Sequence, residues 1–523
     1  MKFINQVDMN LKINNLIQKY WVLLLFVAAK LVLQYVLVNP VYELHRDEFL
    51  HLDQAHHIAF GFISVPPFTS LISKIILLLG GDIFWVRFFP ALFGALTIVF
   101  TWLIVESAGV RSAAKIFVSF SLLFSALARI NILFQPNSAD ILIWTIIFYL
   151  LIKYINSENS RWLYYLAFVV ALGLYNKYNC AFLLFGLLTG LLFTSQRKIF
   201  VNSSFWKALL ISFLLFLPNL AWQIHNHFPV IEHMKVLKAN QLDNNSSVDF
   251  LRSQLFYFFG SLPVTICALV SFAFFKSFKP YRFVGICYFA VIALFAFLKA
   301  KGYYAVGIYP VLLAFGSVFI EKVLSVRWRS VIVPVLFVIN LVIFILTARE
   351  VFPLLSPSEI AQNRAAFEKM GMLRWEDGKN HTLPQDFADM IGWREMAAKA
   401  LIAYNMIPAG ELKNSLVFCN NYGQTGALNY YNRGKMPEAY SFSTDYIFWL
   451  PHLHWIQNIL LVGEKPGVNV TGMFKECRLV GAVENEFARE KNTGIYLLTG
   501  ADSSLTGIFY KMVEERKKTL DIF

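Results

Sequence analysis

The sequence predicts an α-helical membrane protein that crosses the bilayer about eleven times or more and ends in a soluble α/β domain. Hydrophobic residues make up 57% of its 523 residues and charged residues only 15%, a balance that a soluble fold cannot bury. The apolar residues form blocks close to the roughly 20 residues that a helix needs to span hydrocarbon. After residue 348 the composition becomes that of a globular domain.

The apolar blocks define a membrane domain at residues 1–348, and a second domain follows at 349–523. The first block ends at Asn39-Pro40 without a small-residue cleavage site, so we interpret it as a retained span and not as a signal peptide. The predicted spans are 21–38, 83–105, 113–128, 141–154, 162–175, 180–193, 206–222, 255–275, 283–298, 303–320 and 331–347.

Basic residues gather in alternate connections between these blocks, and such connections stay on the cytoplasmic side. They are Arg111, Lys115, Lys153, Arg161, Arg197, Lys198, Lys276, Lys279, Arg282, Lys322, Arg327 and Arg329. This pattern places the N-terminus in the cytoplasm and the C-terminal domain outside a plasma or inner membrane, on the periplasmic side. The net charge of +13 then reflects topology, and we expect no nucleic-acid partner.

The C-terminal domain carries short apolar runs typical of buried strands at 415–419, 459–462 and 495–498, and a helical pattern at 387–404. A small α/β domain explains this alternation. Cys419 and Cys477 lie in this domain, and the sequence leaves open whether they pair. No spacing of cysteine and histidine indicates zinc.

A polar stretch at 43–68 follows the first span and carries the first candidate site. On a helix, Asp47, His51 and Gln54 share one face by their i, i+4, i+7 spacing. We interpret the segment as an amphipathic interfacial helix that presents carboxylates to an aqueous cavity. In the alternative, Asp47 and Glu48 are only the acidic first turn of a helix. A metal site is a further alternative, with ligands among His45, His51, His56 and His57.

Two further polar stretches fall on the same predicted side. Asp140 stands at the mouth of a span, where an acidic side chain is costly unless it is paired or hydrated, although helix capping nearby is an alternative. Lys299 and Lys301 stand at the outer end of a span, against the positive-inside bias. An anionic ligand such as a lipid phosphate explains the two lysines, and snorkelling to headgroups is the alternative.

These pieces, in this order, resemble glycosyltransferase family 39, which contains protein O-mannosyltransferases and lipid A aminoarabinose transferase and has a GT-C fold. The matching residues are Asp47-Glu48, Gly61, Pro66-Pro67, Pro136, Asp140, Trp144, Gly173, Asn176-Lys177-Tyr178, Lys301-Gly302-Tyr303-Tyr304 and Tyr309-Pro310. In the tail, the segment 421–427 with Pro437 is similar to a bacterial branch. Val65 departs from the aminoarabinose branch, which has lysine there.

The resemblance implies that a sugar is moved, with inversion, from a polyprenyl phosphate to an extracytoplasmic lipid, polysaccharide or protein. It implies that Asp47 is the general base and that Glu48 orients Asp47 or contacts the acceptor. The donor phosphate and substrate would be bound by Lys301, Tyr303, Tyr304, Asp140, Arg46 and His51, with Asp140 in a positioning role.

No nucleotide leaves in such a reaction, so we expect that no cofactor is required; a divalent metal is possible, but the outer loops carry no DxD motif that indicates one. The rival class is a lipid or solute transporter or a non-catalytic lipid-binding membrane protein. Transporters usually carry inverted repeats, and the sequence shows none.

Overall fold

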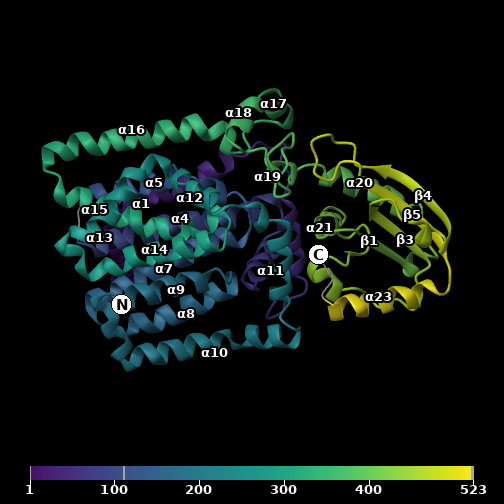
Figure 1. Ribbon diagram of the computed structural model, residues 1–523, viewed down its shortest axis with the longest axis horizontal. Coiled ribbons are helices and arrows are strands. Elements are labelled where there is room, and N and C mark those ends of the chain that lie inside the picture. The colour runs from purple at the N-terminus through teal and green to yellow at the C-terminus, as the bar shows by residue number, and fades with distance from the viewer. Residues whose placement is uncertain (1, 110–111, 520–523) are drawn as a thin grey trace.

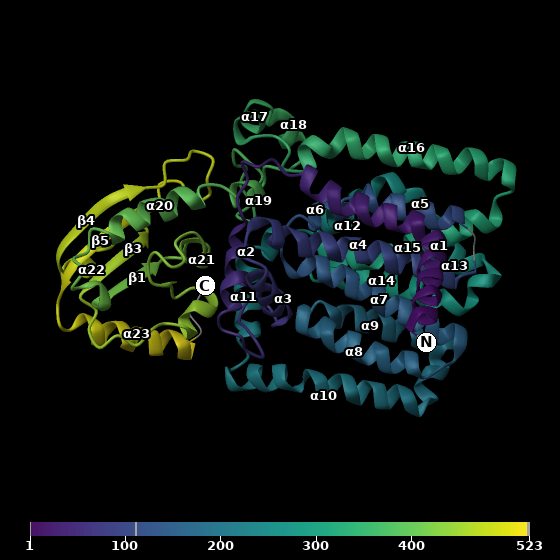
Figure 2. The same cartoon turned by 180° about the vertical axis from the view of Figure 1, so that it is seen from behind.

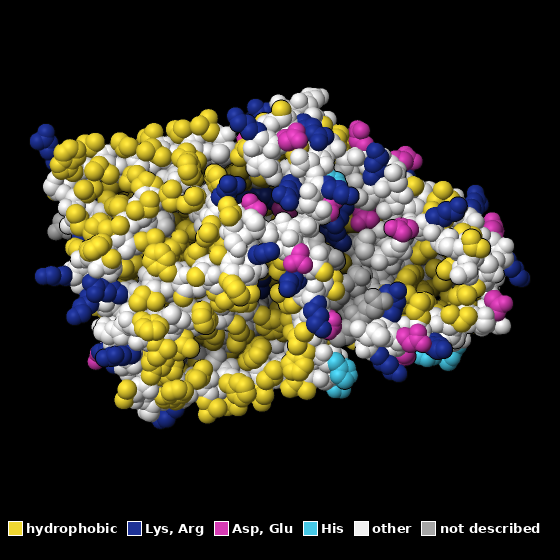
Figure 3. Space-filling view, in the orientation of Figure 1, with side chains coloured by type: hydrophobic (Ala, Val, Ile, Leu, Met, Phe, Trp, Pro, Cys, Tyr) yellow, Lys and Arg dark blue, Asp and Glu magenta, His cyan; other side chains and the backbone are white. Residues whose placement is uncertain are grey.

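The computed structural model describes residues 2–109 and 112–519. A bundle of long helices forms one part of the molecule, and a five-stranded sheet with its helices forms the other (Figure 1). Hydrophobic side chains cover most of the visible face of the bundle, whereas charged side chains are scattered over the sheet domain (Figure 3). A surface this apolar needs lipid as its solvent, so the chain is an integral membrane protein.

Seven helical segments of the described chain are long and apolar enough to cross a membrane, and two bent pairs raise the number to nine. The straight spans lie in α1 (Lys2–Val36), α4 (Ile83–Ser107), α7 (Pro136–Ser157), α10 (Ser203–His225), α14 (Arg282–Phe297) with η4 (Lys276–Tyr281), α15 (Tyr309–Val323) with η5 (Gly302–Ile308), and α16 (Val326–Val351). The bent pairs are α9 (Cys180–Leu192) with η1 (Ser195–Val201), and α12 (Ser247–Phe256) with η3 (Phe259–Ser261) and α13 (Leu262–Phe274).

The two remaining predicted spans, 113–128 and 162–175, form α5 (Ser112–Leu123) and α8 (Arg161–Asn176). Their 12 and 16 residues are fewer than the ~20 that a perpendicular span needs. The multi-spanning helical class is therefore confirmed, while the count of eleven stays a prediction.

The centre of the bundle is formed by α7 and α15, which are the most enclosed spans, whereas α1, α10 and α16 present most of their surface outward. Small residues allow close helix approach in membranes. Gly316 of α15 shows this, because a Cβ there would lie 2.1 Å from the carbonyl oxygen of Val264 in α13.

Short helices gather at the end of the bundle that faces the sheet domain (Figures 1 and 2). They include α2 (Arg46–Gln54), α3 (Phe68–Leu78), α11 (Pro229–Asn240) and, in the connection from α16, α17 (Pro357–Gln362), α18 (Arg364–Lys369) and α19 (Gln385–Ala388). Lys and Arg side chains stand out at the opposite end of the bundle (Figure 3).

The predicted α/β domain is confirmed, with strand order β2-β1-β3-β5-β4. The strands are β1 (Ser415–Cys419), β2 (Ala439–Tyr440), β3 (Asn458–Gly463), β4 (Phe474–Ala482) and β5 (Gly494–Ala501). β1 pairs in parallel with β2 and β3, and β5 pairs antiparallel with β3 and β4. Cys419 on β1 and Cys477 on β4 are free, because β3 and β5 separate their strands.

Helices cover both faces of the sheet, α20 (Trp393–Tyr404) and α21 (Tyr422–Tyr431) on one face and α23 (Leu505–Thr519) on the other. Neighbouring residues of β1 follow this division, since Leu416 packs with α23 and Val417 with α20. The helix predicted from 387 begins later, at Trp393, because Gly392 breaks it with a φ of 89°.

The sheet domain docks on α2 through a shared hydrophobic core. The ring of Phe49 packs against the rings of Trp393, Tyr430 and Tyr431, with centroids 5.6–5.9 Å apart. Phe49 and Leu52 belong to the same buried cluster as residues of α20, α21 and the inner strands. The helix that carries Asp47 is therefore held between the membrane bundle and the soluble domain.

Candidate active site

The first turn of α2 is built around Glu48, a fully buried carboxylate. One oxygen accepts the backbone amide of His45, 2.7 Å away, and completes the helix cap. The other accepts the amide of Phe134, 2.6 Å away, just before α7. Glu48 therefore joins the two segments that carry the predicted carboxylates, and both its oxygens are occupied by backbone groups.

Asp47 lies beside this anchor with about one third of its side chain exposed. Oδ1 accepts a hydrogen bond of 2.8 Å from the Tyr422 hydroxyl, and Oδ2 accepts one of 2.9 Å from the Gln135 amide. Tyr422 comes from the soluble domain and Gln135 from the start of α7. Three separate parts of the chain thus fix the orientation of this carboxylate and leave it partly open.

Positive charge surrounds Asp47. Burial alone would raise its pKa, but His45, Arg46 and His51 outweigh burial, and with the Tyr422 hydrogen bond they lower the pKa of Asp47 to about 2. His45 lies between Asp47 at 3.8 Å and Asp389 at 3.5 Å; burial opposes its charge, yet these carboxylates raise its pKa to about 9. Asp47 is therefore ionised at any physiological pH.

Asp140 stands one turn inside α7 with both oxygens engaged. Oδ1 accepts from the indole of Trp144 at 3.0 Å, and Oδ2 accepts from the Asn179 amide at 2.8 Å. The same Asn179 amide also donates to the backbone oxygen of Tyr304 at 3.0 Å. Asp140 thereby ties α7 to the loop before α9 and, through Asn179, to η5; its positioning role stays a prediction.

Lys177 occupies the centre of the region that Asp140 organises. Its ammonium donates to Asn137 Oδ1 at 2.8 Å and lies 4.3 Å from the ring centroid of Tyr304 and 5.2 Å from that of Tyr303. Burial lowers the pKa of Lys177 to about 8, and Lys301 adds to the effect while Asp140 opposes it. Lys177 is a partly buried cation whose contacts are an amide oxygen and two tyrosine rings.

Lys301 stands next to this group and pairs with Glu376 from the connection to the soluble domain. The two charges are 2.5 Å apart, and Gln385 donates to the other Glu376 oxygen at 2.9 Å. Burial opposes the charge on Lys301, but Glu376, Tyr304 and the more distant Asp47 raise its pKa. Lys301 contacts Glu376 and Asp47 contacts Tyr422, both in the chain that follows α16, so the predicted base and phosphate ligand lie on one side of the molecule.

Hydrogen bonds join Lys177 to Asp47 in an unbroken series. Lys177 donates to Asn137, the Asn137 amide donates to Gln135 at 3.0 Å, and Gln135 donates to Asp47. Tyr422 closes the series from the soluble domain. The structure therefore brings a partly open carboxylate and the ammonium group of Lys177 into one hydrogen-bonded network.

Arg46 and His51, also predicted for substrate binding, lie on the flanks of this network. The Arg46 guanidinium stacks 4.4 Å over the Tyr422 ring, and its Nε is buried without a hydrogen-bond partner. His51 is buried, and its Nδ1 lies 3.2 Å from Gln54 Oε1. Gln54 in turn donates to Asp445 at 2.8 Å, which secures the far end of α2 to the soluble domain.

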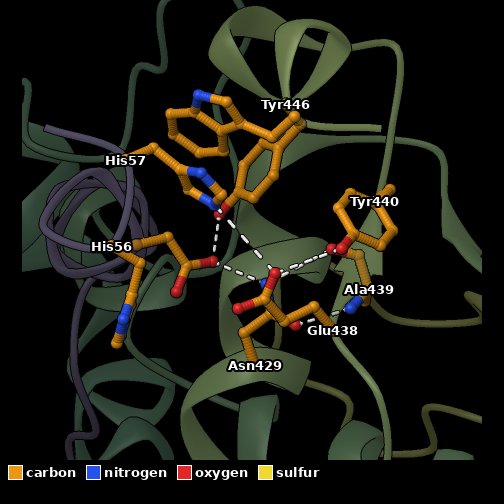
Figure 4. Close-up of a pocket in the computed structure, with 9 residues that line it drawn as sticks. His56, His57, Asn429, Glu438, Ala439, Tyr440 and Tyr446 are labelled. Carbon is orange, nitrogen blue, oxygen red and sulfur yellow. Dashed lines mark hydrogen bonds and ion pairs between the residues drawn. The ribbon is translucent and has the colours of Figure 1, made fainter. Parts of the chain in front are cut away.

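The histidines considered for a metal do not converge. His45 lies at the start of α2, whereas His56 and His57 follow its end, beside Glu438 and Tyr446 (Figure 4). The ring of His57 is stacked on Trp449 at 4.2 Å. Within residues 2–109 and 112–519, no three side chains of the metal-binding types come together.

Sequence reasoning missed three of these residues. Lys177 shows the same signal as Lys301, a lysine at the outer end of an apolar block, yet no role was predicted for it. Tyr422 lies inside the tail segment that carried the resemblance. Glu376 lies in a polar connection where no sequence signal distinguishes it.

Comparison with known proteins supports the predicted class. Residues 64–222, which include Asp140 and Lys177, match the family model described as dolichyl-phosphate-mannose-protein mannosyltransferase. No curated sequence matches the chain at a significant level. The structure is similar to ArnT from Cupriavidus metallidurans bound to undecaprenyl phosphate, with a TM-score of 0.60 and 14% identity over 91% of this chain and 97% of that one.

The apo state of the same enzyme gives the same TM-score and identity over 92% and 98% of the two chains. An Archaeoglobus fulgidus oligosaccharyltransferase is more distant, with a TM-score of 0.48, 12% identity, and 80% and 65% of the chains covered. The likeness to ArnT confirms the GT-C fold, and the family match adds the activity class. The chain is a membrane glycosyltransferase of the GT-C type, which sets the transporter alternative aside.

Proposed function

We propose that this enzyme transfers a sugar from a polyprenyl phosphate to an acceptor hydroxyl on the extracytoplasmic side of the membrane. The observation that carries the proposal is the hydrogen-bonded series from Lys177 to Asp47, because it couples a phosphate-binding cation to a carboxylate. The family match and the ArnT structure, which contains undecaprenyl phosphate, support a lipid-linked donor.

The donor phosphate binds between Lys177 and Lys301 in the proposal. Two partly buried ammonium groups offset the charge that grows on the departing phosphate more strongly than they would in bulk water. In the structure, the Glu376 carboxylate pairs with Lys301 at the position where the phosphate would bind. The phosphate displaces Glu376 from Lys301 when the donor enters.

Asp47 accepts the acceptor proton. The acceptor oxygen forms a bond to the anomeric carbon as the bond from that carbon to the phosphate oxygen breaks, and the bonding electrons leave with the phosphate. The attacking hydroxyl becomes strongly acidic as its oxygen gains positive character. A carboxylate whose pKa is about 2 therefore suffices as its base, at a gain of about 10²–10⁴-fold.

The burial of Asp140 and Glu48 supports inversion at the anomeric carbon. A double-displacement mechanism needs a carboxylate nucleophile in addition to the base. Asp140 and Glu48 are buried, whereas about one third of the Asp47 side chain is exposed, so Asp47 is the one of these three carboxylates that is open to a substrate. A single direct displacement then inverts the configuration at the anomeric carbon of the donor sugar.

Orientation in the membrane follows the same proposal. The basic end of the bundle faces the cytoplasm, and the short helices with the soluble domain face the periplasm. The acceptor, a lipid, polysaccharide or protein, reaches Asp47 from that aqueous side. The two lysines supply the local positive charge, so a bound metal stays unnecessary in this scheme.

Release of the lipid product tests the proposal. Purified protein in proteoliposomes is supplied with a polyprenyl-phosphate hexose and a membrane-glycan extract, and free polyprenyl phosphate is measured together with glycosylated product. We expect both to appear in equal amounts with the wild type and neither with Asp47→Asn. Donor loss without glycosylated product, or identical behaviour of Asp47→Asn, would contradict it.

A further inference from the structure

A second cavity lies where the bundle meets the soluble domain, between the end of α10 and the end of α23. It has a volume of about 210 Å³ and is lined by His225, Asn226, His227, Phe448, Lys517 and Lys518. The ends of the two helices lie side by side in both views (Figures 1 and 2). Among the residues that the structure describes, the lining contains two lysines and two histidines and no carboxylate, which favours an anionic ligand.

The position of α10 relates this cavity to the bilayer. α10 is a span whose apolar side chains face outward, and Phe213, Leu214 and Ile224 are each at least half exposed. The candidate span ends at His225, so we expect the hydrocarbon to give way to headgroups near this residue. Asn226 and His227 continue directly into the cavity, which therefore opens at headgroup depth.

The end of α23 brings the positive charge. Its last turn carries Arg516, Lys517 and Lys518, while its buried face holds it on the sheet. Lys517 lies 3.5 Å from Glu514 on the same helix, an exposed pairing of the kind that contributes little. Lys518 is exposed at the cavity rim, so both lysines are accessible to an anion from the lipid leaflet.

We propose that this cavity binds the phosphate headgroup of an anionic phospholipid of the surrounding leaflet. The phosphodiester lies among Lys517, Lys518 and the two histidines, and its acyl chains follow the exposed face of α10. The lipid then joins the soluble domain to the membrane at a second point besides α2. This site is separate from the Asp47 network and does not depend on the proposed reaction.

Native mass spectrometry of the full-length protein with equimolar phosphatidylglycerol and phosphatidylethanolamine tests this site. We expect the wild type to retain phosphatidylglycerol preferentially. Each lysine near a charged membrane surface contributes roughly fivefold to affinity, so Lys517→Gln with Lys518→Gln should weaken phosphatidylglycerol binding by about 30-fold. Raising the salt concentration should also reduce the wild-type preference, because salt screens exposed charges.

The matched control is Lys511→Gln with Lys491→Gln, which removes the same charge from exposed positions outside the cavity. It should change phosphatidylglycerol binding less than twofold. Lys518→Glu provides an independent variant and should weaken binding further than Lys518→Gln. Three outcomes would overturn the proposal. The two double variants could lose phosphatidylglycerol binding equally, the wild type could show no headgroup preference, or the protein could retain polyprenyl phosphate and no phospholipid.

Discussion

The hydroxyl of Tyr422 donates a hydrogen bond of 2.8 Å to Asp47, across 375 residues of sequence and from one domain to the other. The soluble domain is thus a part of the candidate active site. Docking through Phe49 and the aromatic residues of α20 and α21 sets this contact. The domain therefore acts on the proposed base directly.

Loss of this contact should lower turnover while leaving donor binding intact. Tyr422→Phe removes the hydroxyl and keeps the ring on which Arg46 stacks. A hydrogen bond to a charged group contributes about 1.5 kcal/mol or more, so we expect kcat to fall about tenfold with an unchanged KM for the donor. The same variant should raise the pKa of Asp47. Steady-state kinetics would contradict this role if the donor KM rose and kcat did not change.

Lys177 should control donor binding on the alkaline side. Its pKa of about 8 lies below the ordinary lysine value. The side chain is therefore positively charged below pH 8 and loses this charge as the pH rises through that value. We expect kcat/KM for the donor to decline above pH 8 in the wild type. Asp47, with its pKa of about 2, should cause no decline between pH 5 and 8.

Two substitutions separate charge from shape at Lys177. Lys177→Met should raise the donor KM about 10- to 100-fold through the loss of a charge-assisted hydrogen bond. Lys177→Arg keeps the charge at high pH and should abolish the alkaline decline, whatever its effect on the rate. A decline that persists unchanged in Lys177→Arg would assign the titration to another group.

Glu376 should compete with the donor for Lys301. Glu376→Gln removes the negative charge and keeps the side-chain length, so the donor phosphate no longer displaces an ion pair. Because the pair is partly exposed, we expect a modest decrease of two- to fivefold in donor KM. Asp377→Asn, on the next residue, is the control and should leave KM unchanged. A higher donor KM in Glu376→Gln would show that Glu376 holds Lys301 in place instead.

Glu48 should affect stability as much as activity. In the native protein, two backbone N–H groups donate to the Glu48 carboxylate. In Glu48→Gln, the side-chain NH₂ faces one of these donors, and a buried unsatisfied donor costs about 1–3 kcal/mol. We expect a lower melting temperature of the purified protein and a lower kcat, since Asp47 follows the first turn of α2. Asp47→Asn should leave the melting temperature nearly unchanged. Equal thermal stability of Glu48→Gln and wild type would contradict the anchoring role.

The membrane class and the local candidate residues were predictable because their signals are local. Apolar blocks identified the spans, and a carboxylate or lysine beside an outer span end identified Asp47, Asp140 and Lys301. Strand β4 was not predicted, since after Phe474 its side chains are mostly exposed and no alternating pattern remains.

The partners of the candidate residues were not predictable in the same way. Gln135, Tyr422 and Glu376 acquire their roles from packing between segments that are 75 to 375 residues apart. No propensity or spacing connects such positions in a single sequence. The soluble domain docks on α2 through tertiary packing, and the contact of Tyr422 with Asp47 follows from this docking.

The most direct measurement for the central claim is the turnover of Asp47→Asn with a defined polyprenyl-phosphate sugar, together with equilibrium binding of that donor. The variant removes the proton acceptor and leaves both lysines in place. We predict that donor affinity stays within about threefold of wild type while sugar transfer falls by at least 100-fold. Wild-type turnover in Asp47→Asn would contradict the account.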